Sequence, residues 1–526
     1  MTGIATLIES PPKREFVRRR RARPSTMTVI AWCVALCVLA PLVFLAAEAA
    51  QAGWNALASV LFRGLTASLI VNTLEMTFLV TLIAALLGTT AALLLERTDI
   101  PMRRSLGILL LIPAAIPDFI ETFGWVNVAP WLRGLGGAVF VLSLAVYPFV
   151  MLPAAAALRR IDPRHEEVAR NLGASRVRVA LRVTIPEIRG AIAGGCLLVA
   201  LQLLAEYGSF EMLGFRTFTT EIFTSFQVGF DAQTACGLSI VLVLLSALLV
   251  RGEASVSRRE RDLITSEVIS SHRIELGRWK WPAVAMLSIL VVAALGVPVG
   301  SVVSLLISPG VSTLPSASLV GAVGSTLVYA IGAAILASGG AALIAVGSRR
   351  GRSWLDRAPS MIALIPLAVP GVVVALALSY AAERTFAGRW YQTSALLIIA
   401  YALMFLPLAL IGIRSSLDQV PQSLTEVASS LGVSSRGQIA RVILPLILPG
   451  LGAGFALVLL STITELTATL VLIPTGAQTL ATDFWTYKTN LSYGQAAPYA
   501  ALMILLAGPP LLLLTRMGEH SGGRHR

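Results

Sequence analysis

The stretch EVARNLGASRVRVALRVTIP at residues 167–186 returns as EVASSLGVSSRGQIARVILP at residues 426–445. Each copy begins with Glu-Val-Ala, carries Leu-Gly after two further residues, and ends with a proline that follows an aliphatic residue. Every matching position is displaced by 259 residues. Similarity at one fixed spacing is the signature of a duplicated structural unit. The sequence therefore predicts two equivalent halves.

The repeat extends beyond this stretch in both directions. Pro148 and Pro407 precede it at the same spacing, and Glu206 and Glu465 follow it. A change in spacing from 253 upstream to 262 downstream indicates short insertions in the second half. The remaining matches are Ile-Pro-x-x-Ile-Pro at 112–117 with Ile-Pro-x-x-Val-Pro at 365–370, Thr73-Leu74 with Thr326-Leu327, and 217–223 with 479–485.

The composition indicates a membrane protein. Of the 526 residues, 56% are hydrophobic and 13% are charged, and the mean hydropathy is +0.80. An average soluble domain carries about 25% charged residues, and the four cysteines here form no C-x-x-C pair. Because a bilayer core about 30 Å thick needs about 20 apolar residues per helix, we predict an all-α polytopic protein. The twelve predicted spans are 27–47, 68–95, 106–126, 136–158, 190–208, 236–250, 281–306, 321–346, 358–380, 393–413, 446–466 and 497–515.

Basic residues orient these spans, because cytoplasmic loops retain Lys and Arg. With the N-terminus inside, the inner segments hold 35 of the 41 basic residues and a net charge of +18, whereas the spans and outer loops carry −5. Six spans per half is an even number, so the halves are parallel. The net charge of +13 is expected to face anionic lipid and cytoplasmic partners, not nucleic acid. The predicted segments are a cytoplasmic N-terminus 1–26, a first half 27–250 with inner loop 159–189, a cytoplasmic linker 251–280, a second half 281–515 with inner loop 414–445, and a cytoplasmic tail 516–526.

Each large inner loop is predicted to be a short helix, a glycine break and a second helix. Asp162 followed by proline is a helix start signal, with the carboxylate as the N-cap. Gly173 and Gly432 can adopt the left-handed conformation that ends the first helix. Such a helical knob on the cytoplasmic face suits docking into the cleft of a partner. The residues expected to cap the second helix are Ser175 in one loop and Ser434 or Ser435 in the other.

The pattern E-x-A-x3-G-x9-[IV]-x-[IL]-P in a cytoplasmic loop resembles the signature of permease subunits of binding-protein-dependent ABC importers. The resemblance covers roughly 68–250 and 321–515, although Val168 and Val427 replace the usual middle alanine. It implies two tandem type I permease halves in a bacterial inner membrane, two cytoplasmic ATP-binding subunits and an external solute-binding protein. The residues that it assigns to coupling with the ATPase are Glu167, Ala169, Gly173, Pro186, Glu426, Ala428, Gly432 and Pro445.

Carboxylates within the spans are functional candidates, because charge in a bilayer is costly. Glu206 and Glu465 are repeat-equivalent, and two interpretations stay open: they line a translocation path, or they anchor helix ends in the headgroup region. Glu75, Asp118 and Glu121 have no acidic counterparts in the second half. We expect water-facing or interfacial positions for these three.

The sequences around the equivalent pair resemble ferric-iron ABC permeases, at 204–221 in the first half and 464–482 in the second. Thr467 and Ile473 depart from the proline and arginine of that subfamily. Carboxylate and phenolate oxygens suit Fe³⁺, which is a hard cation. The resemblance implies a translocation path that includes Glu206, Tyr207, Glu465 and Thr469, and it assigns no metal ligands.

No ATP-binding motif occurs on this chain. A P-loop ends in G-K-[ST], and none of the three lysines, Lys13, Lys280 and Lys488, follows a glycine. Nor does the chain contain H-E-x-x-H or G-x-S-x-G. We therefore predict that the chain is not an enzyme and carries no cofactor, with ATP and Mg²⁺ on a partner subunit.

The predicted function is the transmembrane component of an ATP-driven importer, with ferric iron as the first candidate solute. Thiamine, polyamine, sulfate and phosphonate importers stay open as alternatives. A proton-coupled secondary transporter is a remoter alternative, because the loop at 96–101 lacks the G-x-x-x-D-[RK]-x-G-[RK] pattern usual in such proteins. A membrane scaffold has no specific feature in its favour.

Overall fold

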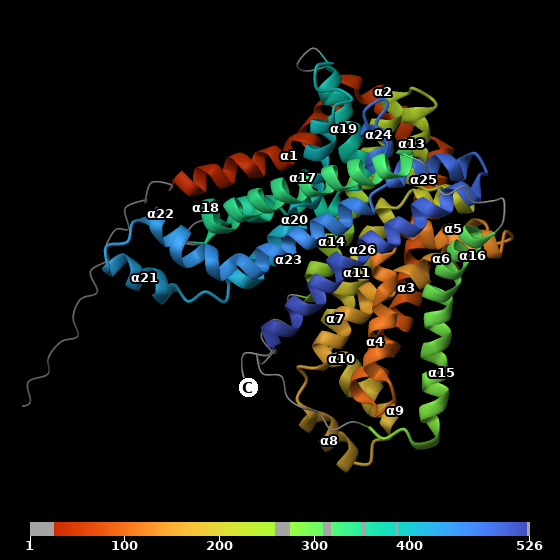
Figure 1. Ribbon diagram of the computed structural model, residues 1–526, viewed down its shortest axis with the longest axis vertical. Helices are drawn as coiled ribbons and strands as arrows, with labels where there is room; N and C mark the ends of the chain where they lie inside the picture. Colours follow the sequence, from red (N-terminus) through yellow and green to blue (C-terminus); the bar gives the residue numbers. More distant parts are fainter. Residues whose placement is uncertain (1–25, 258–273, 309–316, 350–353, 385–387, 523–526) are drawn as a thin grey trace, which may run out of the picture.

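The computed structural model describes residues 26–257, 274–308, 317–349, 354–384 and 388–522 (Figure 1). These residues form helices and turns, with a single bridge between Thr98 and Ile274 and no strand, which confirms the all-α class. The basic N-terminus up to residue 25 and the middle of the linker lie outside the described residues. The helices up to the linker are α1 Thr26–Ala52, α2 Trp54–Leu61, α3 Gly64–Arg97, α4 Arg103–Leu111, η1 Ile112–Ala115, α5 Asp118–Val128, α6 Gly134–Val146, α7 Pro148–Leu158, α8 Pro163–Asn171, α9 Arg176–Val179, η2 Ala180–Thr184, α10 Ile185–Glu187, α11 Arg189–Ala205, α12 Gly208–Leu213, α13 Phe218–Gln227 and α14 Ala232–Ser257. Those after it are η3 Gly277–Trp279, α15 Lys280–Val291, η4 Val292–Gly296, α16 Val297–Ile307, α17 Ala317–Ser348, α18 Trp354–Ile362, η5 Ile365–Ala368, α19 Gly371–Arg384, α20 Ser394–Leu417, α21 Gln422–Ser430, α22 Ser435–Gln438, η7 Ile439–Ile443, α23 Leu444–Ile463, α24 Thr467–Leu472, α25 Leu480–Thr489 and α26 Tyr493–Gly522.

Within these residues, eight helices are long and apolar enough to cross a membrane, and three bent pairs bring the number to eleven. The twelfth predicted span, 497–515, lies within α26. The spans predicted at 106–126 and 358–380 are each broken in the middle, with bends of 99° and 106°. Both breaks fall at the repeated Ile-Pro-x-x-[IV]-Pro stretch, because each proline removes a helix hydrogen bond and its ring crowds the preceding turn.

The first span of each half packs on the opposite half. Helix α1 lies along α17 (Figure 1), so closely that a Cβ built on Gly347 would be 2.6 Å from the carbonyl oxygen of Met27. In the other direction, α15 and α16 cover the first half, and the indole nitrogen of Trp125 donates to the carbonyl of Ala293 at 3.2 Å. Small residues allow such close approach between membrane helices. The two predicted halves are therefore interleaved in space.

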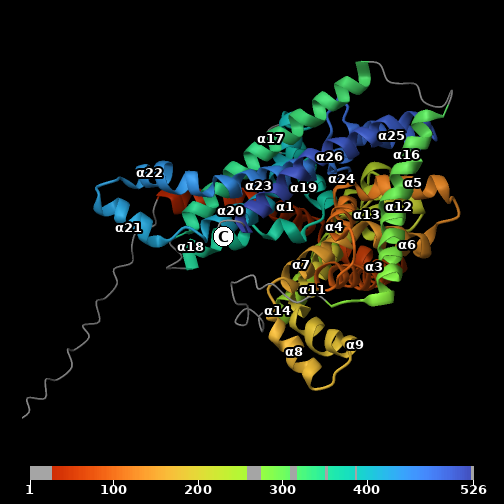
Figure 2. The same ribbon diagram turned by 60° about the horizontal axis from the view of Figure 1, so that its bottom comes forward.

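The halves share an apolar core at one end of the molecule and diverge from there. Phe119 and Phe123 of α5 meet Phe484 of α25 with ring centroids 5.5 and 5.2 Å apart. From this end the helices of the two halves run in different directions, so that α8–α9 and α21–α22 project at separate places (Figures 1 and 2). The two inner loops are thus the parts of the halves that lie far from the shared core.

The predicted duplication extends to single hydrogen bonds. The Thr73 hydroxyl accepts from the amide of Phe218 at 3.4 Å, and Thr326 accepts from Leu480 at 3.0 Å. Thr217 and Thr479 each begin the following helix with a reciprocal capping box. Equivalent residues make equivalent contacts in both halves, which confirms the internal repeat.

Candidate functional site

The repeat-equivalent carboxylates Glu206 and Glu465 lie at helix breaks, where one helix ends and a short helix follows. Helix α11 ends just before Glu206, whose carboxylate accepts the amide of Ser209 at 2.7 Å. Helix α23 ends at Ile463, earlier than the predicted 466, and the Glu465 carboxylate accepts the amide of Ala468 at 2.9 Å. Each carboxylate therefore caps the short helix that follows, α12 or α24, where the helix dipole favours negative charge.

These two breaks meet across the interface between the halves. A Cβ built on Gly208 would be 2.9 Å from Cδ2 of Leu466. The ring of Tyr207 lies 5.5 Å from that of Trp485, centroid to centroid. The structure thus brings the predicted path residues of both halves into one region.

The first half buries two further acids on α5, which packs against α12. Asp118 is 8% exposed and Glu121 is 1% exposed, so the expected water-facing or interfacial positions are wrong for both. The bend between Ala115 and Asp118 turns α5 into the body of the protein, which the sequence pattern alone does not reveal. Gln202 donates to the Asp118 carboxylate at 3.2 Å. Glu75 is exposed.

The second half surrounds Glu465 with hydroxyl groups. A cavity of about 10 Å³ lies beside it, with room for about one water molecule. The Tyr401 and Thr469 hydroxyls hydrogen-bond to one another at its edge. The first half has Met76, Leu142 and Leu203 where the second has Tyr329, Tyr401 and Thr462. The polar side chains that line the cavity are Thr326, Tyr329, Tyr401, Thr462, Glu465 and Thr479.

Sequence reasoning missed this cavity, although a comparison of the two halves position by position could have found it. Tyrosines 329 and 401 lie in apolar spans with no motif, and only their hydrophobic counterparts in the first half mark them. No group of three or more His, Cys, Asp or Glu side chains that could hold a metal ion occurs in the part of the chain that the structure describes.

The inner loops have the predicted local structure. Asp162 caps α8 by accepting the amide of Arg164 at 2.9 Å. Gly173 and Gly432 end the first helices at φ values of +84° and +75°. Ser434 accepts the amide of Gly437 at 3.3 Å. Ser175 occupies the N-cap position of α9 but makes no capping hydrogen bond.

The two loops present matching residues to solvent. Leu172 and Leu431, which precede the glycines, are 84% and 77% exposed, and Val168 and Val427 are 58% and 57% exposed. Exposed apolar side chains at equivalent positions indicate a contact surface for another protein. Of the predicted coupling residues, Glu167, Gly173, Pro186, Glu426, Gly432 and Pro445 are exposed, Ala169 is half-buried and Ala428 is buried.

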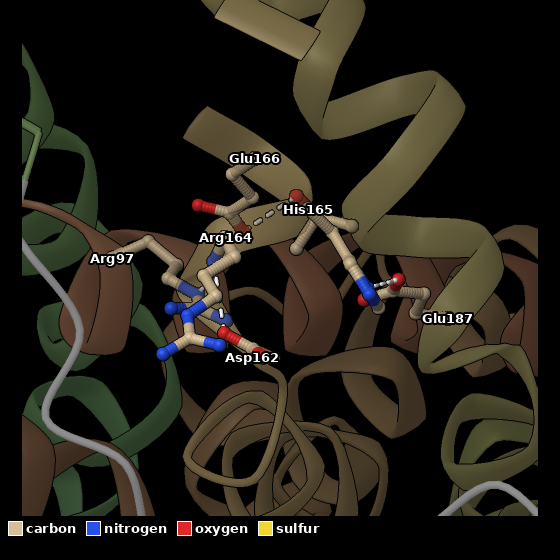
Figure 3. A network of polar contacts seen from close by, with 7 residues as sticks. Arg97, Asp162, Arg164, His165, Glu166 and Glu187 are labelled. Carbon is tan, nitrogen blue, oxygen red and sulfur yellow. Dashed lines mark hydrogen bonds and ion pairs between the residues drawn. The ribbon is translucent and has the colours of Figure 1, made fainter. Parts of the chain in front are cut away.

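Glu166, which precedes the predicted coupling residue Glu167, makes contacts inside the protein. Glu166 is buried, lies 3.4 Å from the guanidinium of Arg97 at the end of α3, and accepts the hydroxyl of Thr184 at 2.9 Å (Figure 3). Nearby, His165 contacts Glu187 at 2.6 Å. No motif marks Glu166, because its counterpart in the second half is Thr425.

The end of the linker is fastened to the first half. The Lys280 ammonium lies 2.7 Å from the Asp99 carboxylate, which also accepts the amide of Leu276 at 3.0 Å. These hydrogen bonds hold the pKa of Asp99 below its usual value. Arg176 of α9 donates to the carbonyl of Glu275. Residues 274–280, called the linker clip below, therefore join the α3–α4 loop to the first inner loop.

A duplicated bundle of membrane helices, with two exposed helical loops on one side and buried carboxylates between the halves, defines a membrane transport subunit. The family model described as "Binding-protein-dependent transport system inner membrane component" matches residues 14–261 and 337–520. The chain therefore belongs to this family of ABC-importer permeases, in a form that carries two permease domains on one polypeptide. The family comprises transport permeases and not enzymes.

Three curated relatives illustrate the range of the similarity. The chain is 31% identical to the Fe(3+)-transport system permease protein FbpB 2 of Haemophilus influenzae, over 94% of this chain and 99% of that protein. It is 24% identical to the probable ABC transporter permease protein y4fN of Sinorhizobium fredii, over 80% and 83% of the two chains. It is 26% identical to the spermidine/putrescine permease PotB of Haemophilus influenzae, over 38% of this chain and 79% of that one.

Proposed function

We propose that this permease conducts ferric iron released by an external binding protein. The cavity beside Glu465 carries the proposal, because its polar lining consists of one carboxylate and five hydroxyl groups, all of them oxygen donors. A hard cation prefers such ligands. Similarity to a ferric-iron permease along nearly the whole chain supports the same substrate.

The path would run between the halves past Glu206, Tyr207, Glu465 and Thr469. The acids of the first half supply negative charge, and the hydroxyls of the second half supply neutral oxygen ligands. A site with few fixed charges suits passage, since binding must be favourable enough for entry and weak enough for release. In this proposal the contact of Tyr207 with Trp485, whose ring centroids lie 5.5 Å apart, would close one end of the path.

The ATPase subunits would act on the permease through the inner loops. Both termini would lie in the cytoplasm. Two ATP-binding subunits, which hold ATP and Mg²⁺, would dock on α8–α9 and α21–α22. The exposed leucines at 172 and 431 would fill apolar pockets of these partners, and the carboxylates at 167 and 426 would pair with basic groups. The approach of the two ATPase subunits would then swing the two bundles, which share their aromatic core at the other end.

Radiolabelled iron uptake into proteoliposomes tests this function. The permease is reconstituted with its ATPase and binding protein, and uptake is measured with and without ATP. We expect ATP-dependent uptake of ferric iron that falls at least tenfold in E465Q, with the exposed-site variant E75Q as the matched control. Uptake of a polyamine or sulfate but no iron would overturn the proposal that ferric iron is the substrate. Uptake on a proton gradient without the ATPase would overturn the assignment to ATP-driven importers.

A further inference from the structure

The first inner loop is tied to the body by a buried ion pair. The side chains of Arg97 and Glu166 are 4% and 7% exposed. Among the described residues, the Arg97 side chain has no hydrogen-bond partner besides this ion pair. Glu166 in turn accepts from Thr184, so it joins α8 to the segment that leads into α11. A buried charge without its partner is strongly unfavourable. The position of α8 is therefore fixed to the end of α3.

Helix α3 extends this tie toward the path. It packs on α6, α7 and α11, and its Thr73 hydroxyl accepts from the amide of Phe218 at the start of α13. The neighbouring Thr219 donates its hydroxyl to the carbonyl of Glu206. A continuous set of contacts thus joins Glu166 in the loop to Glu206 at the interface between the halves.

The second half lacks the residues for this tie. Thr425 and Ile443 replace Glu166 and Thr184, and neither can form an ion pair. Arg350, the counterpart of Arg97, lies outside the described residues. The polar pair His165 and Glu187 becomes Leu424 and Leu446, and the positions of the ion pair Glu96 and Arg159 hold Arg349 and Asp418. The Arg349 guanidinium donates to the carbonyl of Val420 at 3.3 Å, which is a neutral contact and not a buried ion pair. Within the part of the chain that the structure describes, the linker clip contacts the first loop.

We infer that the two inner loops transmit ATPase motion unequally. The first moves with α3 as a rigid unit, because Arg97 and Glu166 act as positioning residues. The second, without this pair, shifts relative to the body of its half. This inference rests on the proposed docking of ATPase subunits at both loops, and it adds that the first loop delivers the larger displacement to the path.

Amide hydrogen exchange of the full chain in lipid nanodiscs tests the tie without any substrate. In E166Q we expect exchange in residues 163–171 to be at least tenfold faster, with 422–430 unchanged. The matched control is E167Q, a neighbouring carboxylate that is exposed, which leaves exchange in α8 unchanged. The double variant R97M/E166M removes both charges and should restore protection to within about threefold, since buried ion pairs can often be replaced by apolar pairs.

Two further measurements separate positioning from docking. In the complex with ATPase and binding protein, E166Q should keep its ATPase subunits while iron transported per ATP hydrolysed falls at least fivefold. E167Q should instead lose ATPase subunits during purification. Unchanged exchange in α8 of E166Q, or equal loosening of α21, would overturn the inference. Because exchange needs neither iron nor ATP, failure of the proposed substrate would leave this result intact.

Discussion

Gly208 of the first half lies directly against Leu466 of the second, and a Cβ added to the glycine would be 2.9 Å from Cδ2 of that leucine. The same Cβ would lie 2.8 Å from Cβ of Phe119. Leu466 lies in the helix break that carries Glu465, and Gly208 begins the helix that follows the break at Glu206. The contact therefore holds the two breaks together only while position 208 has no side chain.

Replacing Gly208 should open this contact. A valine forces the breaks apart, because the neighbouring atoms leave no room for its Cβ, and overpacking of this kind costs about 1–3 kcal/mol. We expect G208V to let iron leak through proteoliposomes without ATP. The control is G300A, since nothing lies within 4 Å of a Cβ at that position. An ATP-dependent, leak-free G208V would show that the contact does not close the path.

We expect the hydroxyl of Tyr401 to contribute more to iron uptake than its aromatic ring does. Y401F keeps the packing but removes the hydrogen bond to Thr469 and one oxygen donor at the cavity. Stability should fall by only about 0.5–1.5 kcal/mol, whereas we expect iron uptake to fall at least tenfold. Uptake and thermal unfolding are measured together, with the exposed-site variant Y391F as the control. Loss of uptake in proportion to loss of folded protein would contradict a role in conduction.

The loop glycines should be required for coupling. Gly173 and Gly432 have positive φ, where a non-glycine residue costs roughly 1–2 kcal/mol. The double variant G173V/G432V should distort both knobs, so that ATP hydrolysis continues without transport or the ATPase fails to dock. Copurification and uptake are measured against G194A, a helical glycine whose Cβ meets nothing within 4 Å. Normal uptake in the double variant would refute the docking proposal.

The linker clip should release in acid. Hydrogen bonds from Lys280 and Leu276 lower the pKa of Asp99, so the clip contributes stability above the ordinary aspartate pKa of about 4 and loses it as pH falls through the lowered value. K280Q should move this release to higher pH. The release is measured as amide exchange at residues 274–280 between pH 3 and pH 6. This range runs from about one unit below to about two units above the ordinary aspartate pKa. An identical pH profile for the parent chain and K280Q would exclude the ion pair as the cause.

Much of this organisation could be predicted from local signals. The spacing of 259 residues between the Glu-Val-Ala stretches, the apolar runs and the loop glycines depend only on residues near one another in sequence. The predicted spans end at 208 and 466, close to the observed helix ends at Ala205 and Ile463. The contact between these two helix ends depends on residues far apart in the chain, so no local pattern reveals it. The buried position of Asp118 follows from a bend of 99° whose direction no periodicity encodes.

The sequence by itself determined the membrane class, the duplication and the knobs on the inner loops, because hydropathy, charge and glycine conformations act over short stretches of chain. Only the tertiary structure decided that the first span of each half packs on the opposite half and that Glu166, not Glu167, is buried against Arg97. It also decided that Tyr329, Tyr401 and Thr462 line a cavity beside Glu465. These features depend on which helices pack together. Residues far apart in the chain meet there, and their pairing is set by the close packing of whole helices.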